Sequence, residues 1–381
     1  MVLLLLLGGI MYYVVFAKFY IDYLDTGRDD GVQYGMASEW ASKYGNTIDD
    51  SECAQIAEEF ESAKGTFASQ LSSVPEAASY GISSYDDYIS FTNTYLEDFE
   101  AGIAEEDEAV LDLMDDITSK TNFLEVQVMD ETISEHERMN TTSLTSLAEE
   151  LKGDEASRLA ELDNSDIKYG YIPSALLDAT TGLGTALVLW ISISIIILLS
   201  PTVVRDRLNR VQNLQYSSRA GRRIFSVQVA ASLISGILLT VVNCLALGLI
   251  LLAKGVFVFK DFYIFTSEYI PWVDWTYGKY ILVLALMSIA IGLCVTLLTV
   301  FFSRFSKTYI GMLLKGTLLM VGLINFYGML PTVTRPFYMF NPMGLQLHFK
   351  GQELIFLLIL VLISIILIGT SLISHRKKEL I

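Results

Sequence analysis

The arginines of one short segment are the side chains best suited to binding chemistry in this 381-residue chain. Residues 203–225, VVRDRLNRVQNLQYSSRAGRRIF, hold six arginines against one acid, Asp206. If the segment is helical, its aliphatic residues share one face, which predicts an amphipathic helix on the inner membrane surface. The arginines then either contact anionic lipid and fix the topology, or also dock a cytoplasmic partner that transmits force to the neighbouring helices.

Sequence patterns of catalysis and nucleotide binding are missing. The chain has no G-x-x-x-x-G-K-[ST] phosphate loop, no H-E-x-x-H and no G-x-S-x-G. Its histidines are scattered, and its cysteines have neither disulfide nor metal-ligand spacing. We therefore expect no enzyme activity, no cofactor on this chain and no nucleic-acid partner, so any energy must come from another subunit. The residues in question are His136, His348, His375, Cys53, Cys244 and Cys294.

Three polar residues within apolar runs are weak candidates for a translocation path, because polar groups are costly in lipid. Lys315 lies eight residues beyond Lys307, roughly 12 Å along a helix, so its long stem can also snorkel to the interface. Asn243 and Asn325 can instead serve as polar contacts between helices.

Charge is divided sharply along the chain. Residues 18–178 hold 37 of the 43 acids and 9 of the 26 basic residues, a net charge of −28. The remaining sequence is mostly long apolar runs, and the mean hydropathy of the whole chain is +0.45. The two parts therefore belong in different solvents, water and a lipid bilayer.

Apolar runs predict six membrane spans, since a span needs about 20 apolar residues. The first lies within residues 1–24, and a cleaved signal peptide is the alternative there; the lack of a basic start favours a retained anchor. The other five are expected at about 180–202, 224–252, 280–302, 309–330 and 353–374 within residues 179–381.

Basic residues cluster at alternate span boundaries, which predicts the orientation because such residues tend to stay in the cytoplasm. The clusters are the arginine-rich segment, Arg304 with Lys307, and the HRKK run at 375–378. Both termini are then cytoplasmic, and residues 25–178 are extracellular. We expect a multi-pass protein of a bacterial cell membrane.

Residues 25–178 carry apolar residues three or four apart, which predicts a mostly helical domain of three to five long helices. A helix-spaced aromatic stripe favours a folded domain over a disordered acidic loop. Its charge is either a solvated face or an attraction for cationic ligands. Nine aromatics between 254 and 279 favour a belt at the lipid headgroups, with a substrate exit rim as the alternative. The stripe comprises Tyr80, Tyr85, Tyr88, Phe91, Tyr95 and Phe99.

The sequence LLSPTVVRDRLNRVQNLQYSSRAGRRIFSVQVAASL resembles span two, the coupling helix and the span-three entry of ABC-2 type exporter permeases. Asp206-Arg207 takes the place of that family's acidic–basic pair, although the family often has Glu there and a Lys where Gln228 stands. FNPMGLQLHF, residues 340–349, also resembles the family's segment before the last span. The resemblance implies contact with a partner ATPase across loop 203–223, through Arg205, Asp206, Arg207, Arg210, Arg219, Arg222 and Arg223.

The resemblance also implies an all-α, six-span permease with a large insertion between spans one and two. Such a subunit would pair with a second permease copy or homologue and with separate nucleotide-binding ATPase subunits, which carry ATP and Mg²⁺. It would export an amphiphilic or hydrophobic substrate, such as an antimicrobial peptide, a lipid or an envelope precursor. The rival hypothesis is a non-transporting scaffold or receptor that acts through its extracellular domain.

Overall fold

The computed structural model describes residues 2–20, 29–103, 107–141, 153–164, 171–208, 224–265, 271–329 and 351–378. Within these ranges the chain is helical and forms no strand; its extended pairing there is the single bridge between Tyr263 and Thr276. The fold class is therefore all-α, as the sequence predicts.

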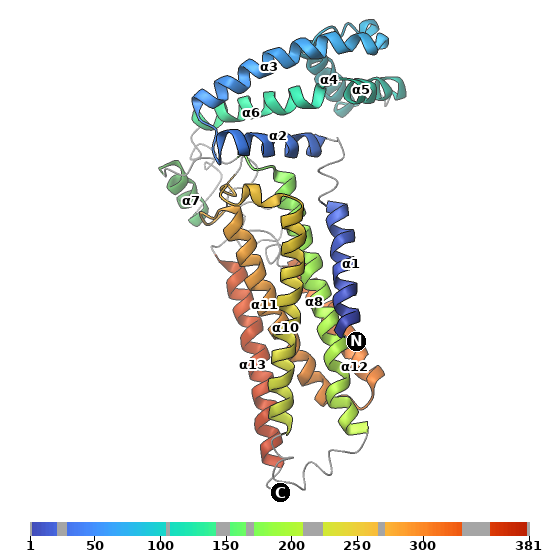
Figure 1. Ribbon diagram of the computed structural model, residues 1–381, viewed down its shortest axis with the longest axis vertical. Helices are drawn as coiled ribbons and strands as arrows, with labels where there is room; N and C mark the ends of the chain where they lie inside the picture. The colour runs from blue at the N-terminus through green and yellow to red at the C-terminus, as the bar shows by residue number, and fades with distance from the viewer. Residues whose placement is uncertain are drawn as a thin grey trace.

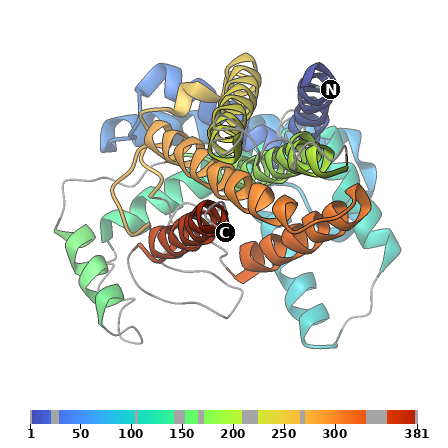
Figure 2. The same cartoon turned by 90° about the horizontal axis from the view of Figure 1, so that it is seen from below.

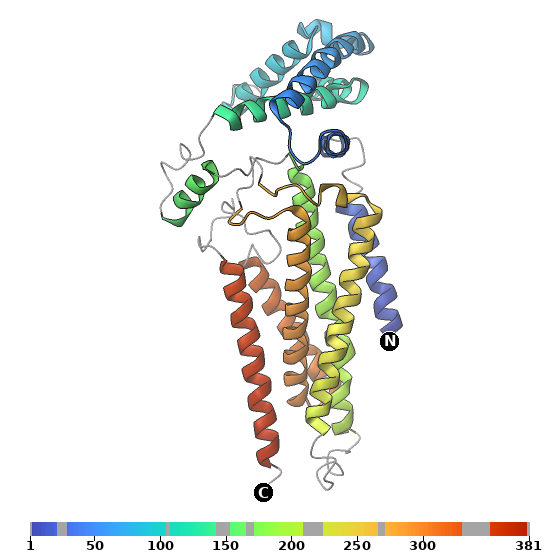
Figure 3. The ribbon, with the colours of Figure 1, turned by 60° about the vertical axis from the view of Figure 1, so that its left-hand side comes forward.

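Six helices lie side by side along the long axis of the molecule (Figure 1, Figure 3). α11 occupies the middle of this bundle, with α10 and α8 on one side and α12 and α13 on the other (Figure 2). α8 also packs against α1, α10 and α12. The bundle helices are α1 (Val2–Tyr20), α8 (Ser174–Leu208), α10 (Ile224–Ala253), α11 (Tyr277–Arg304), α12 (Tyr309–Met329) and α13 (Gln352–Lys378).

Four of these helices are long and apolar enough to cross a membrane, judged by length and composition among the described residues. Shorter apolar stretches occur in α1, at Leu5–Ala17, and in α12, at Tyr309–Leu319. Outward-facing side chains of the bundle are often large and aliphatic, for example Ile234 at 68% exposure. This surface indicates a membrane protein, because water-soluble domains rarely expose so much apolar area. The four candidate spans are Ala175–Pro201, Ile224–Ala253, Tyr277–Arg304 and Leu354–Ser374.

The span predicted at 180–202 lies within a longer helix, α8, whose candidate membrane-crossing part is Ala175–Pro201. This helix begins at Ser174, before the expected domain boundary at 179, and continues to Leu208, beyond the expected end at 202. Pro173 immediately precedes it, and the Pro173 carbonyl accepts the first hydrogen bonds of the helix from the N–H groups of Leu176 and Leu177. Hydropathy detects only the apolar middle of a helix, so the polar turns at both ends of α8 lay outside the predicted span.

A second group of helices, here named the helical cap, lies beyond one end of the bundle (Figure 1). Its core packs the rings of Phe67, Tyr85, Tyr88 and Phe123 around Ile117. The cap comprises α2 (Asp29–Tyr44), α3 (Asp50–Gln70), η2 (Leu71–Ser73), η3 (Pro75–Tyr80), α4 (Tyr85–Glu100), α5 (Glu108–Lys120), α6 (Phe123–Thr141) and α7 (Asp154–Asp163).

The cap differs in two ways from the three to five long helices expected. The described part contains six α-helices, because side-chain N-caps at Asp49, Ser84 and Asp107 start new helices within the acidic sequence. The aromatic stripe is also only partly internal. Tyr85 and Tyr88 are buried, whereas Tyr80 and Phe99 are exposed.

The cap is joined to the bundle by the turn that follows α10. α2 lies across the end of the bundle, where the Tyr34 ring lies 5.7 Å from that of Phe259 in η6 (Val256–Phe259). The Asn46 amide donates a hydrogen bond of 3.1 Å to the Asp261 carbonyl. The Tyr171 hydroxyl donates one of 2.5 Å to the Gly45 carbonyl.

The aromatics of residues 254–279 lie partly inside the protein, so a lipid belt and an exit rim both stay predictions for the others. Five of them are buried, because the cap and the start of α8 cover them. The number of aromatics favoured a belt at the lipid headgroups, because the sequence alone does not reveal that the cap packs against these residues. The five are Phe259, Phe262, Phe265, Trp272 and Tyr277.

Candidate functional site

The helix ends away from the cap carry basic residues in α8, α11 and α13, and we name this part of the bundle the basic end. α8 finishes there at Leu208 and α10 begins there at Ile224. α11 ends nearby at Arg304, and α13 ends there at Lys378. The cap, with most of the acids, occupies the opposite end. Charge is thus separated along the long axis.

The arginine-rich segment connects two helices that meet at the basic end. Arg205, Asp206 and Arg207 lie in the last turns of α8 rather than in a loop, a correction to the expected loop 203–223. The remaining predicted coupling residues, Arg210, Arg219, Arg222 and Arg223, lie outside the described residues. The described residues that flank the segment, Leu208 and Ile224, both lie at the basic end.

Pro201 lies inside α8, shortly before these arginines. Its ring nitrogen carries no hydrogen, so the carbonyl four residues earlier loses its helical partner. Prolines are a common cause of bending in otherwise regular helices. The last turns of α8 are therefore held less rigidly to the rest of that helix than they would be without the proline.

Arg304 links three helices at the basic end. Its guanidinium donates hydrogen bonds to the carbonyl and the hydroxyl of Ser371 on α13. The same group lies 5.2 Å from the ring centre of Phe225, in the first turn of α10. A cation over an aromatic face is attracted by the ring quadrupole. Arg304 thus ties the end of α11 to the start of α10 and to α13.

The sequence identified Arg304 only as a residue that sets orientation. Its position at the end of an apolar run predicts a membrane boundary but says nothing about partners on other helices. The one sequence feature that could have indicated this contact is Phe225, two residues after Arg223. An aromatic ring beside a basic cluster is a frequent partner of a guanidinium group.

Lys315 directs its ammonium toward the end of α11. The Nζ atom donates hydrogen bonds of 3.1 Å to the Phe305 carbonyl and 3.2 Å to the Ser306 hydroxyl. Cations are favourable at helix C-termini because the last carbonyls lack intrahelical partners. This geometry agrees with a snorkelling lysine, the alternative to a transport role.

Asn243 has its own partners farther along the bundle. Its Oδ1 accepts a hydrogen bond of 2.9 Å from the Tyr13 hydroxyl, and its Nδ2 donates one of 2.7 Å to the Leu239 carbonyl. α1 approaches closely here because Gly9 leaves room for Trp190 and Asn243. This is an interhelical polar contact between α1 and α10.

The three candidate translocation residues do not form a single site among the described contacts. Asn243 contacts α1, whereas Lys315 contacts the end of α11. Asn325 belongs to α12, but its side chain lies outside the described set.

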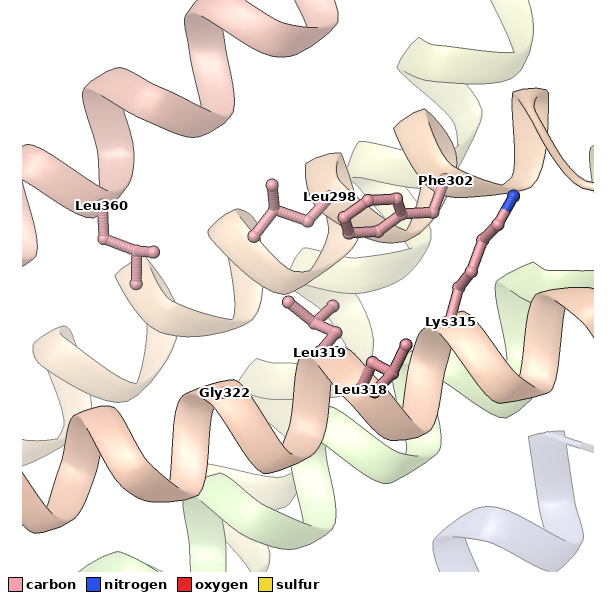
Figure 4. A pocket seen from close by; sticks show the side chains of 7 residues that line it. All are labelled: Leu298, Phe302, Lys315, Leu318, Leu319, Gly322 and Leu360. Carbon is pink, nitrogen blue, oxygen red and sulfur yellow. The ribbon is translucent and has the colours of Figure 1, made fainter.

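A cavity of about 410 Å³ lies between α11, α12 and α13. Figure 4 shows that Lys315 stands at one end of the lining and Leu360 at the other. With one cation and otherwise apolar walls, the cavity suits a hydrocarbon chain better than a polar solute. Its lining residues are Leu298, Phe302, Lys315, Leu318, Leu319, Gly322 and Leu360.

The cap end of α8 is fixed to α11 by two buried hydroxyl pairs. Thr180 and Tyr277 hydroxyl oxygens lie 2.6 Å apart, and those of Thr181 and Tyr280 lie 3.1 Å apart. Groups of His, Cys, Asp and Glu arranged to hold a metal ion do not occur in the described ranges.

No protein-family model, curated protein or solved structure matches this chain. Function must therefore be inferred from the charge separation, the helix contacts and the cavity.

Proposed function

We propose that the chain is the permease subunit of an ATP-driven exporter of the ABC-2 type, with its basic end in the cytoplasm. The supporting observation is that the arginine-rich segment enters and leaves the bundle at the end opposite the acidic cap. Basic residues favour the cytoplasmic side of a membrane. A soluble ATPase could therefore reach this segment, while the cap lies outside the cell.

The contacts at the basic end offer a route for force. An ATPase bound to residues 205–223 would act on the last turns of α8 and the first turn of α10. Phe225 touches Arg304, and Arg304 holds Ser371, so movement of α10 would reach α11 and α13. Coupling of this kind requires helices that can pack in two discrete arrangements. We assign this property to the bundle helices.

The proposal includes partners that the chain itself lacks. Two separate ATPase subunits would bind ATP and Mg²⁺, and a second permease copy or homologue would complete the path. An amphiphilic or hydrophobic substrate suits a bundle whose cavity is apolar. The acidic cap would gate, receive or extract that substrate on the outer side.

The deciding experiment is purification of the tagged full-length chain from its native membrane, followed by an assay of ATP hydrolysis. We expect an ATPase to accompany it. Arg219→Glu with Arg222→Glu should abolish substrate-stimulated ATP turnover while membrane insertion persists, because the partner's contact is lost. A matched charge reversal at the cap end, Lys260→Glu with Lys279→Glu, should leave turnover near that of the unchanged chain.

A further variant separates docking from transmission. Arg304→Lys keeps the charge but loses the planar guanidinium that contacts Phe225 and Ser371. We expect the ATPase to remain bound while turnover responds less to substrate. Purification without any ATPase, together with unchanged turnover in the arginine double variant, would favour the scaffold or receptor instead.

A further inference from the structure

The cavity beside Lys315 opens on a flank of the bundle. α12 packs against α8 and α11, whereas α13 packs against α11 and α10, so the two helices diverge over α11. Leu318, on the rim, is 71% exposed. A molecule in the surrounding bilayer could therefore enter sideways without displacing a helix.

The cavity is polarised along the helices that line it. The Lys315 ammonium lies at the end nearest the helix terminus Phe305, and the walls toward Gly322 and Leu360 are apolar (Figure 4). Lys315 and Gly322 are separated by roughly 10 Å along α12, given a rise of about 1.5 Å per residue. One leaflet of a bilayer core is about 15 Å thick. The cavity thus extends along much of one acyl chain.

The cation at its mouth retains binding capacity. An ammonium has three N–H donors, and Lys315 directs two of them to Phe305 and Ser306. Residues 277–329, which form α11 and α12, contain no Asp or Glu. Among the described side chains no carboxylate pairs with Lys315, so an external anion is the fitting partner for its remaining donor.

We propose that this cavity binds an anionic phospholipid, with one acyl chain along Leu298, Leu319 and Leu360 and the phosphate at Lys315. A second copy of the chain fits less well, because in a shared orientation it brings another basic end to the same level and no carboxylate from α11 or α12. The site does not depend on the transport proposal; only the choice of the inner leaflet uses the proposed orientation.

The test is native mass spectrometry of the full-length chain in detergent, titrated with phosphatidylglycerol and with phosphatidylcholine of identical acyl chains. We expect one tightly retained phosphatidylglycerol, bound at least about tenfold more tightly than phosphatidylcholine, as a charge-assisted hydrogen bond implies. Lys315→Gln should remove that preference. Lys307→Gln, which removes a nearby exposed charge outside the lining, should preserve it.

Filling the apolar end provides a second, independent check. A Cβ at Gly322 meets no atom within 4 Å, so Gly322→Leu should fold normally and occupy the cavity. It should weaken both lipids, while Gly248→Leu, at an equally open position on α10, should weaken neither. Equal binding of the two lipids, or unchanged phosphatidylglycerol binding in Lys315→Gln or Gly322→Leu, would overturn the proposal. The proposal would also be overturned if either variant still bound the lipid but no longer bound a second copy of the chain.

Discussion

Gly236 of α10 faces Thr296 of α11 so closely that a Cβ atom at position 236 would overlap the threonine Oγ1. The same relationship recurs in reverse one turn away, where Gly292 faces Thr240. Each threonine hydroxyl donates a 2.8 Å hydrogen bond to the carbonyl of the glycine four residues earlier in its own helix. Small residues at such crossings let two helices approach closely in a membrane.

Gly236→Ala should therefore destabilise the bundle. Alanine normally favours a helix over glycine, but its methyl group would meet the short, buried Thr296 side chain, which cannot move away. Overpacking of this kind costs about 1–3 kcal/mol. The free energy of unfolding in detergent measures the effect.

Gly248→Ala, in the same helix with open space around it, serves as the control for Gly236→Ala. It should be neutral or stabilising by up to about 1 kcal/mol. Adding Thr296→Ala to Gly236→Ala should recover part of the loss. If the two glycine variants behave alike, the close approach of α10 and α11 is wrong.

Tyr13→Phe should weaken the attachment of α1. The change removes the hydroxyl that contacts Asn243 and leaves its amide oxygen without that donor. Hydrogen bonds between membrane helices contribute about 0.6 kcal/mol on average and up to about 1.7. A double-mutant cycle with Asn243→Leu isolates the coupling energy. Strictly additive losses would mean that the two side chains do not interact.

Arg158→Met should loosen α7. Arg158 is only 3% exposed, pairs with Asp274 and donates a 3.0 Å hydrogen bond to the Pro271 carbonyl. Losing a charged hydrogen bond from a buried group lowers the free energy of unfolding by about 1.5–3 kcal/mol. The loss is smaller here because Asp274 is 40% exposed and solvent partly screens its charge. We expect lower thermal stability and faster proteolysis near α7. Arg138→Met removes a partly exposed ion pair with Glu135 within α6 and should change stability by under about 1 kcal/mol.

Cysteine labelling can test the orientation of the chain with little background. Cys53 is buried in the cap, and this burial, reinforced by the acids Glu137 and Asp50, raises the pKa of its thiol. Less thiolate is then present at any given pH, so native labelling should be slow. Cys244 and Cys294 lie within bundle helices.

Two introduced cysteines then report opposite sides. On intact cells an impermeant maleimide should label Ala68→Cys in the cap and spare Ser217→Cys in the arginine-rich segment. Permeabilised cells should label both. Reaction of Ser217→Cys in intact cells would reverse the proposed orientation and remove the ATPase from reach of that segment.

Apolar runs predicted the bundle helices well because a membrane span is a composition signal. The helix predicted at 224–252 is Ile224–Ala253, and that at 280–302 is Tyr277–Arg304. α8 extends beyond the span predicted at 180–202, since its polar turns carry no hydropathy signal. Six spans stay a prediction, because four helices meet the length and composition of a span among the described residues.

Contacts between helices were much harder to predict. Arg304 was recognised as a charge at a membrane boundary and Lys315 as a charge within an apolar run, but their partners Phe225, Ser371 and Phe305 come from other helices or helix ends. One sequence pattern does indicate close helix packing: the spacing G-x-x-x-T occurs in both α10 and α11, at Gly236 and Gly292. Which glycine meets which threonine depends on how the antiparallel helices α10 and α11 are aligned. The spacing of residues within one helix does not define that alignment.

The length of α8 has a mechanical consequence. Its 35 residues extend about 52 Å, well beyond the roughly 30 Å of a hydrocarbon core, so one rod reaches from beneath the cap to the arginines. The hydroxyl pairs with Tyr277 and Tyr280 act as a pivot near one tip. A force on the distant tip would act on the anchored end through a long lever arm, and bending at Pro201 would reduce the tilt that this force produces.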